Sequence, residues 1–252
     1  MLDKKKVLLG MSGGVDSSVS ALLLKEKGYE VIGITMQLWC DDKKTVEDAK
    51  KVCDKLGIEH HVVNYKEEFK KYVIDDFINK YLDAKTPNPC IECNRYLKFG
   101  MMWEKAKELG AYYIATGHYA KTCYSEKYKR YVIKKSDSIK KDQSYVLYNI
   151  PKEIIEHIIF PLQSFESKDD IRNIAIKNGL SVANKPDSQE ICFIPDNDYS
   201  NFLKENVNDI ESKNCIKPGN IVDISGNVRG QHKGLINYTI GQRKGLGIQN
   251  DK

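Results

Sequence analysis

Residues 6–28, KVLLGMSGGVDSSVSALLLKEKG, contain the clearest structural pattern of this chain. Residues 6–11 are predicted to form a short buried strand, and apolar residues then recur at helical spacing from Val15 until Gly28 ends the helix. A turn of small residues, Ser12-Gly13-Gly14, joins the two. The arrangement predicts an anion site, because the first N–H groups of a helix lack intrahelical partners and glycine lets the backbone approach the anion closely.

The turn lacks the lysine that P-loops carry, which argues against transfer of a γ-phosphoryl group. Ser12, Ser17 and Ser18 offer hydroxyl donors, whereas Asp16 would repel a bare phosphate and is expected to hold Mg²⁺ or to face away. The string SGGVDSS after a strand resembles the pyrophosphate loop of the ATP pyrophosphatase (PP-loop) superfamily. That resemblance implies that the loop binds the β- and γ-phosphates of ATP as a leaving group. A plain Gly-Gly turn with Ser and Asp capping is the alternative.

Strands and helices alternate through the first half of the chain. Three further strands are predicted over 30–37, 59–64 and 112–116, with helices over 46–56, 66–82 and 96–109. Such alternation predicts an α/β fold, a Rossmann-like parallel sheet with helices on both faces.

The pattern changes after Gly117. A hairpin is predicted over 119–124 and 128–134, then a short amphipathic helix from Ile150, and small helices over 168–178 and 199–207. From Pro218 onward, glycines recur among short β-like runs, which predicts three or four strands of a small antiparallel barrel that looks unfinished. We therefore expect an ATP-binding domain at 1–160, a helical central domain at 161–214 and an incomplete β-barrel domain at 215–252.

The composition is that of a globular chain of 252 residues, with 41% hydrophobic and 30% charged residues. The formal net charge of +5 permits a polyanionic partner, although a lysine-rich solvated surface would give the same value. No segment approaches the ~20 apolar residues of a membrane span, so we expect a cytoplasmic protein without a membrane partner. Seven cysteines, an odd number, do not indicate a disulfide scaffold in a chain of this length.

Three cysteines lie beside prolines in predicted loops. Cys90 and Cys93 form a C-x-x-C within TPNPCIECNR, and Cys192 lies within KPDSQEICFIP. The C-x-x-C spacing suits a metal, an iron–sulfur cluster or a redox pair, and a chance pair of cysteines is the alternative. Cys53, in contrast, falls on the apolar face of a helix and is predicted to be a core residue.

Five motifs along the chain together resemble the tRNA-specific 2-thiouridylase (MnmA) family. They are TPNPxxxCN, ATGHYA, KDQSY, KPDSQEICFI and YTIGQRKGLGI, and they occur in the family's order. The resemblance implies a tRNA-uridine 2-sulfurtransferase that uses ATP and Mg²⁺ to adenylate the C2 oxygen of the wobble uridine, position 34, in tRNAs of the Glu, Gln and Lys type. Sulfur would arrive as a persulfide from a cysteine desulfurase or a sulfur-carrier protein. The products would be 2-thiouridine, AMP and pyrophosphate.

The resemblance also implies roles for single residues. Cys93 matches the nucleophile, Cys192 the persulfide-bearing cysteine, and Asp16 a catalytic position in the loop. Contacts with ATP are expected from Gly10, Met11, Ser12, Gly13, Gly14, Val15, Asp16, Ser17, Met36 and Gly117. Contacts with tRNA are expected from Asn88, Pro89, Cys90, His118, Lys141, Asp142 and Gln143. Without the resemblance, the residues also allow a structural histidine at position 118 and a plain polar turn at 141–143.

Two features depart from the family's pattern. Many members carry Asp where this chain has Cys90, so three thiols, Cys90, Cys93 and Cys192, are candidate ligands of a [4Fe-4S] cluster. Disulfide cycling needs only Cys93 and Cys192, and both mechanisms stay open. Family members also run on to complete the barrel, which makes a truncated, non-catalytic chain that binds tRNA or ATP an alternative function. Another PP-loop adenylating ligase, which would need no paired cysteines, is the second.

Overall fold

The structure is a computed structural model that describes residues 2–40, 43–186, 191–194, 196, 198–208 and 213–248. The chain forms two compact units, one of Met1–Tyr72 with Cys90–Ser188 and one of Val73–Pro89 with Gln189–Lys252. This division does not follow the predicted domain limits at 160 and 214, and the three-domain organisation stays a prediction. Within the described ranges, no helix has the length and apolar character needed to cross a membrane.

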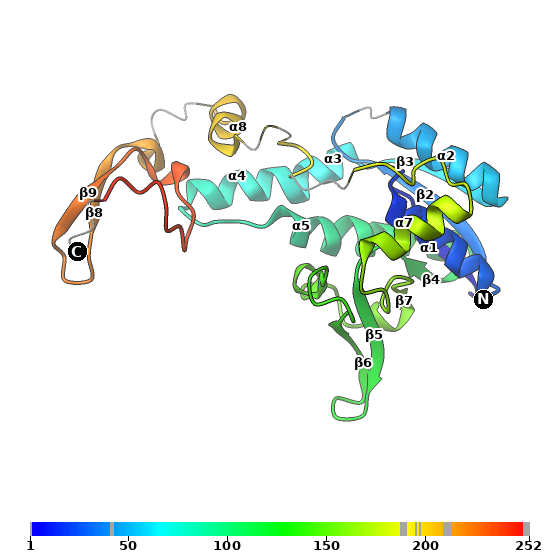
Figure 1. The fold of residues 1–252 in the computed structure, drawn as a ribbon. Helices are drawn as coiled ribbons and strands as arrows, with labels where there is room; N and C mark the ends of the chain where they lie inside the picture. Colours follow the sequence, from blue (N-terminus) through cyan, green and yellow to red (C-terminus); the bar gives the residue numbers. More distant parts are fainter. Residues whose placement is uncertain are drawn as a thin grey trace. The chain divides into compact units, whose positions relative to one another are not determined.

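A five-stranded parallel sheet forms the centre of the first unit (Figure 1). Its strand order is β3-β2-β1-β4-β7, with all neighbours parallel, so the predicted α/β fold class is confirmed. The strand bounds are Asp3–Gly10 (β1), Glu30–Gln37 (β2), Glu59–Asn64 (β3), Ala111–Ala115 (β4) and Ile158–Ile159 (β7).

The fifth strand, β7, was not predicted. The sequence from Ile150 indicated a short amphipathic helix, whereas the structure has only a 3₁₀ turn, Ile155–His157, before the strand. Two β-branched residues are too short a run to show a period. Only their pairing with Ile114 and Ala115 of β4 makes them a strand.

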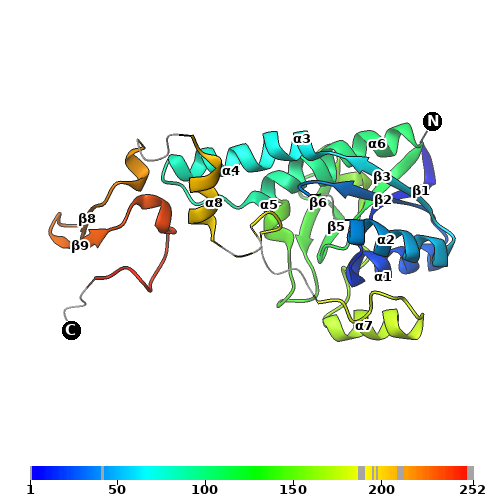
Figure 2. The same ribbon diagram turned by 90° about the horizontal axis from the view of Figure 1, so that it is seen from above.

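Alternation along β1 sends its side chains to two separate cores. Val7 and Leu9 pack with helices on one face, and Leu8 packs on the other; all three are fully buried. Figure 2 shows α1 (Val15–Glu26), α2 (Lys43–Leu56) and α7 (Lys168–Lys177) on one side of the sheet and α6 (Met102–Glu108) on the other. The prediction of helices on both faces is therefore confirmed.

The helical stretch that carries the C-x-x-C begins earlier than predicted. It comprises α5 (Pro89–Glu92), a π-helical segment (Cys93–Met101) and α6, whereas the prediction began at Tyr96 and kept both cysteines in a loop. Pro89 occupies the first helical turn, where its fixed φ is suitable and its missing N–H would have had no helical partner. The predicted helix over 66–82 is confirmed as α3 (Lys66–Phe69), a π-helical segment (Lys70–Ile74) and α4 (Asp75–Leu82).

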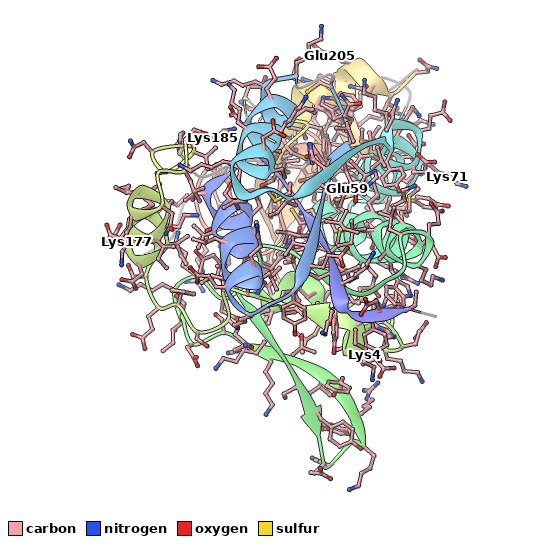
Figure 3. The ribbon with its side chains drawn as sticks, turned by 90° about the vertical axis from the view of Figure 1, so that its right-hand side faces the viewer. Lys4, Glu59, Lys71, Lys177, Lys185 and Glu205 are labelled. Carbon is pink, nitrogen blue, oxygen red and sulfur yellow. The ribbon has the colours of Figure 1, made fainter. Side chains whose placement is uncertain are left out.

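A two-stranded hairpin leaves the carboxyl end of β4. It consists of β5 (Ala120–Ser125) and β6 (Arg130–Lys135), and it forms an antiparallel sheet of its own, as predicted. We call residues 120–135 the arm, because Figures 1 and 3 both show it projecting from the rest of the first unit.

An aromatic core holds the second unit together. The ring of Phe77 on α4 lies 5.4 Å from that of Phe193 and 6.2 Å from that of Phe202, measured between centroids. Tyr81 stacks on Tyr199 at 5.1 Å. Both Phe202 and Tyr199 belong to α8 (Tyr199–Asn206), a helix that the sequence predicted.

The described residues of the glycine-rich C-terminal part form fewer strands than expected. The described residues after Pro218 hold one antiparallel pair, β8 (Gly219–Val222) and β9 (Val228–His232), where three or four strands were predicted. Beyond β9, four described glycines have positive φ: +108° at Gly234, +84° at Gly241, +72° at Gly245 and +68° at Gly247. These turn conformations interrupt the extended runs that the sequence indicated.

Candidate active site

The candidate site lies at the carboxyl edge of the sheet, between β1 and β4. The chain order along the sheet reverses at this pair, and open α/β sheets bind ligands in the crevice outside such a switch point. Residues 11–14 follow β1 and residues 116–119 follow β4, so the topology brings the predicted phosphate loop and the ATGHYA motif to one edge.

The phosphate loop has a conformation that requires glycine. Gly13 has a φ of +62°, and a Cβ at this position would lie 2.7 Å from the Thr45 carbonyl oxygen. Serine hydroxyls close the loop: Ser17 Oγ accepts a hydrogen bond from the Ser12 N–H at 3.2 Å and donates one to the Gly14 carbonyl at 3.1 Å. The backbone is therefore fixed by the protein's own bonds, which is the preorganisation that an anion site needs.

Asp16, in the first turn of α1, has two side-chain partners from distant parts of the sequence. The Tyr119 hydroxyl donates to its Oδ1 at 2.9 Å, and the Lys168 ammonium group donates to its Oδ2. Gly117 packs directly against this turn, since a Cβ there would lie 3.0 Å from the Asp16 Cβ. The two expectations for Asp16, a metal ligand or a side chain turned away, did not include this ion pair.

A second lysine is hydrogen-bonded to the backbone of the loop. Lys185 Nζ donates to the Gly13 carbonyl at 3.0 Å and to Asp48 Oδ2 of α2 at 2.9 Å. Figure 3 shows the labelled Lys185 beside α2. Sequence reasoning missed both lysines as site residues. The only available signal was that Lys185 opens the KPDSQEICFI motif; Lys168 simply follows the helix-capping Ser167.

His118 is half-buried and faces aromatic side chains. Its Nδ1 lies 2.8 Å from Thr116 Oγ1, and its ring lies 5.9 Å from that of Phe99 and 6.4 Å from that of Phe160. Burial, followed by the positive charge of Lys98, lowers the pKa of His118 to about 3. The imidazole is therefore neutral at physiological pH, and its contact with tRNA stays a prediction.

The 141–143 segment is hydrogen-bonded to the backbone of Tyr119 through Gln143. Gln143 Oε1 accepts from the Tyr119 N–H at 3.0 Å, and the Gln143 N–H donates to the Tyr119 carbonyl at 2.8 Å. Asp142 Oδ1 accepts from the Ser136 N–H, whereas Lys141 is exposed. Gln143 thus positions the tyrosine that holds Asp16, and the tRNA contacts of the segment stay predictions.

Met36 is half-buried near the carboxyl end of β2, the strand next to β1. Its side chain packs against the core that contains Ile34 and Met102. The residue therefore lies at the same carboxyl edge as the phosphate loop, and its contact with adenine stays a prediction.

The C-x-x-C thiols lie on the helical stretch that starts at Pro89. Cys90 is exposed, whereas Cys93, three residues later, is buried. Beside it, the buried Asn94 donates from Nδ2 to the Val146 carbonyl at 3.1 Å, and its Oδ1 has no hydrogen-bond partner among the described residues. Because residues at i and i+3 lie on the same face of a helix, the difference in exposure comes from what packs over each thiol and not from their spacing.

Cys192 is exposed and belongs to the second unit, as do Asn88 and Pro89. The partnership of Cys192 with Cys93 stays a prediction, and residues 187–190 and 195 of the KPDSQEICFIP segment lie outside the described residues. Across the described parts of each unit, no three His, Cys, Asp or Glu side chains are grouped as metal ligands. The [4Fe-4S] ligand set therefore stays a hypothesis.

Cys53 is the thiol whose predicted role is confirmed. It lies on the buried face of α2, where it is fully buried in the core, and burial raises its pKa to about 11. Its Sγ would lie 2.9 Å from a Cβ at Gly33, so the thiol packs tightly against β2.

Comparison with known proteins finds two family models that match consecutive parts of the chain. The tRNA methyl transferase HUP domain matches residues 5–196, and the tRNA methyl transferase PRC-barrel domain matches residues 200–252. The solved structure of NMN synthetase from Francisella tularensis resembles this chain with a TM-score of 0.47 and 13% sequence identity, over 74% of this chain and 67% of that one.

Curated relatives match along almost the whole chain. The tRNA-specific 2-thiouridylase MnmA of Clostridioides difficile (strain 630) is 52% identical over 259 residues. The tRNA-specific 2-thiouridylase MnmA 1 of Caldanaerobacter subterraneus subsp. tengcongensis is 54% identical over 260 residues. In both, the match covers 98% of this chain and 70% of the relative.

Proposed function

This chain belongs to the tRNA-specific 2-thiouridylase family, and we propose that it replaces the C2 oxygen of the wobble uridine of tRNA with sulfur, using ATP. The observation that carries the proposal is the SGGVDSS loop, which is held in a fixed conformation at the N-terminus of α1 and at the switch point of the sheet. The expected substrates are tRNAs of the Glu, Gln and Lys type, and the expected sulfur source is a persulfide carrier protein or a cysteine desulfurase.

The first step in this proposal is adenylation of the uridine. The C2 oxygen attacks the α-phosphorus of ATP, the bond to the β-phosphate breaks, and pyrophosphate leaves. The N–H groups of the first turn of α1 and the ammonium groups of Lys168 and Lys185 stabilise the charge that develops on the pyrophosphate. The cations that the loop itself lacks would thus come from two distant segments.

Asp16 is the carboxylate that fits Mg²⁺ at this loop, because its side chain is partly exposed in the first turn of α1. Mg²⁺ bound there would neutralise phosphate charge. Lys168 would exchange its partner from Asp16 to the anion, and Tyr119 would keep the carboxylate in place through Oδ1.

The second step in this proposal transfers sulfur. The terminal sulfur of a Cys192 persulfide attacks the adenylated carbon and AMP leaves, which joins Cys192 to the base through two sulfur atoms. The Cys93 thiolate then attacks the Cys192 sulfur, so that a Cys93–Cys192 disulfide forms and the base keeps the outer sulfur as 2-thiouridine. A thiol reductant restores both cysteines. Cys93 is buried, so we expect it to become reactive only when the tRNA is bound.

The iron–sulfur cluster mechanism requires Cys90 as a ligand, whereas the disulfide cycle does not use it. If the three thiolates held a [4Fe-4S] cluster, Cys90→Ala would lose iron and activity together after anaerobic reconstitution. If the enzyme cycles a disulfide, Cys90→Ala would keep most of its activity in iron-free protein. Cys90→Asp, which restores the residue common in the family, should then be fully active. Full activity of rigorously iron-free protein would exclude the cluster.

The test of the proposed function is complementation. A host that lacks its own 2-thiouridylase should regain 2-thiouridine at the wobble position when it expresses this chain, as measured by mass spectrometry of digested tRNA. Purified protein should release pyrophosphate from ATP only when tRNA is present. Absence of both results would contradict the proposal, whereas pyrophosphate release without thiolation would limit it to adenylation.

A further inference from the structure

The arm carries the charge excess of the whole chain. Its sixteen residues, 120–135, contain six basic side chains and one acidic side chain, a net charge of +5, which equals the formal net charge of all 252 residues. The remainder of the chain is therefore balanced. Lys127, Arg130 and Lys134 are exposed, and Lys129 shares the tip with its ion-pair partner Glu126.

Three exposed tyrosine rings alternate with these cations. Exposure is 47% for Tyr124, 58% for Tyr128 and 40% for Tyr131. Tyr124 and Tyr131 form a cross-strand pair with centroids 5.6 Å apart, and Lys127 Nζ lies 5.1 Å from the centre of the Tyr128 ring. Protection of a sheet edge explains charged side chains but not exposed aromatic rings. Cations interleaved with aromatic faces are the combination that holds phosphates and stacks bases.

The arm starts at the candidate active site. Its first residue, Ala120, is fully buried and follows Tyr119, whose hydroxyl is bonded to Asp16. Gln143 fixes the same tyrosine from the other side. Exposure increases from this root toward the tip, where residues 126–131 are all exposed, and the projection is visible in Figures 1 and 3. A polyanion bound along the arm would therefore lead to the carboxyl edge of the sheet.

We propose that the arm is an RNA-binding surface, in which the exposed cations contact phosphates and the Tyr128 ring stacks on an unpaired base. Identification of this RNA as tRNA rests on the proposed function. The arm is not needed for the chemistry in this proposal, so its loss should raise KM for tRNA and leave kcat nearly unchanged.

The first test neutralises the arm. In K127Q/R130Q/K134Q, the affinity for an unmodified tRNA transcript should fall, and the slope of log K against log salt should decrease in magnitude by about 2. The matched control is K51Q/K152Q/K177Q, which removes three exposed lysines from other parts of the same unit and should bind as the wild type does. Thermal unfolding of both triple variants should match the wild type, because all six side chains are exposed.

The second test separates stacking from charge. Tyr128→Ala should weaken transcript binding about ten-fold, the loss expected for one stacked base, with an unchanged salt slope. Tyr128→Phe keeps the ring and should bind within about two-fold of the wild type.

Equal affinity and equal salt slope in the wild type and the arm triple variant would overturn this proposal alone. A wild-type chain that does not bind the transcript would overturn both this proposal and the proposed function. If the triple variant instead lost binding to phosphatidylserine vesicles and kept its affinity for tRNA, the arm would be a membrane contact and the proposal would be wrong.

Discussion

The phosphate-loop edge and the thiol-bearing helix are held in different ways. At the loop, Asp16 is bonded to Lys168 and Tyr119, and Lys185 is bonded to Gly13 and Asp48. On the helix, Cys90 is exposed, Cys93 is buried, and the predicted partner Cys192 lies in the other compact unit. Fixed charges can therefore prepare the loop for leaving-group chemistry before the substrates bind. Sulfur transfer requires thiols that meet, so we expect the thiol region to depend on movement.

The largest expected effect is a complete loss of thiolation in variants that keep pyrophosphate release, which would show that the two regions perform separate steps. Cys93→Ser and Cys192→Ser should each abolish thiolation, because a serine hydroxyl is a poor nucleophile at neutral pH, yet both should keep tRNA-dependent pyrophosphate release. The measurements are 2-thiouridine by mass spectrometry and pyrophosphate by a coupled assay. Thiolation at the wild-type level in either variant would contradict the assigned roles.

The next effect concerns the loop edge alone. Lys168→Ala should lower the rate of pyrophosphate release by about 10²–10³-fold, the usual cost of removing one preorganised donor from a developing negative charge. Lys177→Ala, at the exposed end of the same helix α7, is the matched control and should be silent. If Lys168→Ala kept the wild-type rate, the lysine would serve only to hold Asp16.

A smaller effect distinguishes Cys53 from Cys93, which is also buried. Cys53→Ser should destabilise the fold by about 1–3 kcal/mol, because it buries a hydroxyl in the apolar core of the first unit, and it should leave thiolation unchanged. Since the pKa of Cys53 is about 11, its thiol should also resist alkylation at pH 8 in the folded protein. Chemical denaturation and mass spectrometry after iodoacetamide check both points; rapid labelling of Cys53 would show that this core opens.

The last expected effect is a pH dependence of stability. The pKa of His118 falls to about 3 on folding, so between pH 6.5 and 3 the unfolded chain binds up to one more proton at this residue. The free energy of unfolding should therefore decrease as the pH falls through this window. His118→Gln removes this contribution, so the wild type should lose more stability than the variant between pH 7 and pH 4.5 in urea titrations. Parallel losses would contradict the lowered pKa of His118.

Much of the fold was accessible from local patterns. The runs 30–37 and 59–64 were predicted with the bounds that β2 and β3 have in the structure, because each contains β-branched residues and begins shortly after a glycine that ends a helix. Cys53 was placed in the core from its position on one helical face. β7 was missed because two isoleucines become a strand only through their pairing with β4.

The amino-acid sequence was enough to predict the phosphate loop, the parallel sheet around it and the family, since these depend on short-range spacing and on motifs that follow one another along the chain. The side chains that surround the loop became known only from the folded structure. Asp16 and Lys168 are 152 positions apart, and Gly13 and Lys185 are 172 apart, so no local pattern could pair them. The structure also shows that Cys90 is exposed whereas Cys93 is buried. Burial and ion pairing depend on which distant segments fold against a residue. The order of strands in the sheet, which differs from their order in the sequence, determines which segments become neighbours.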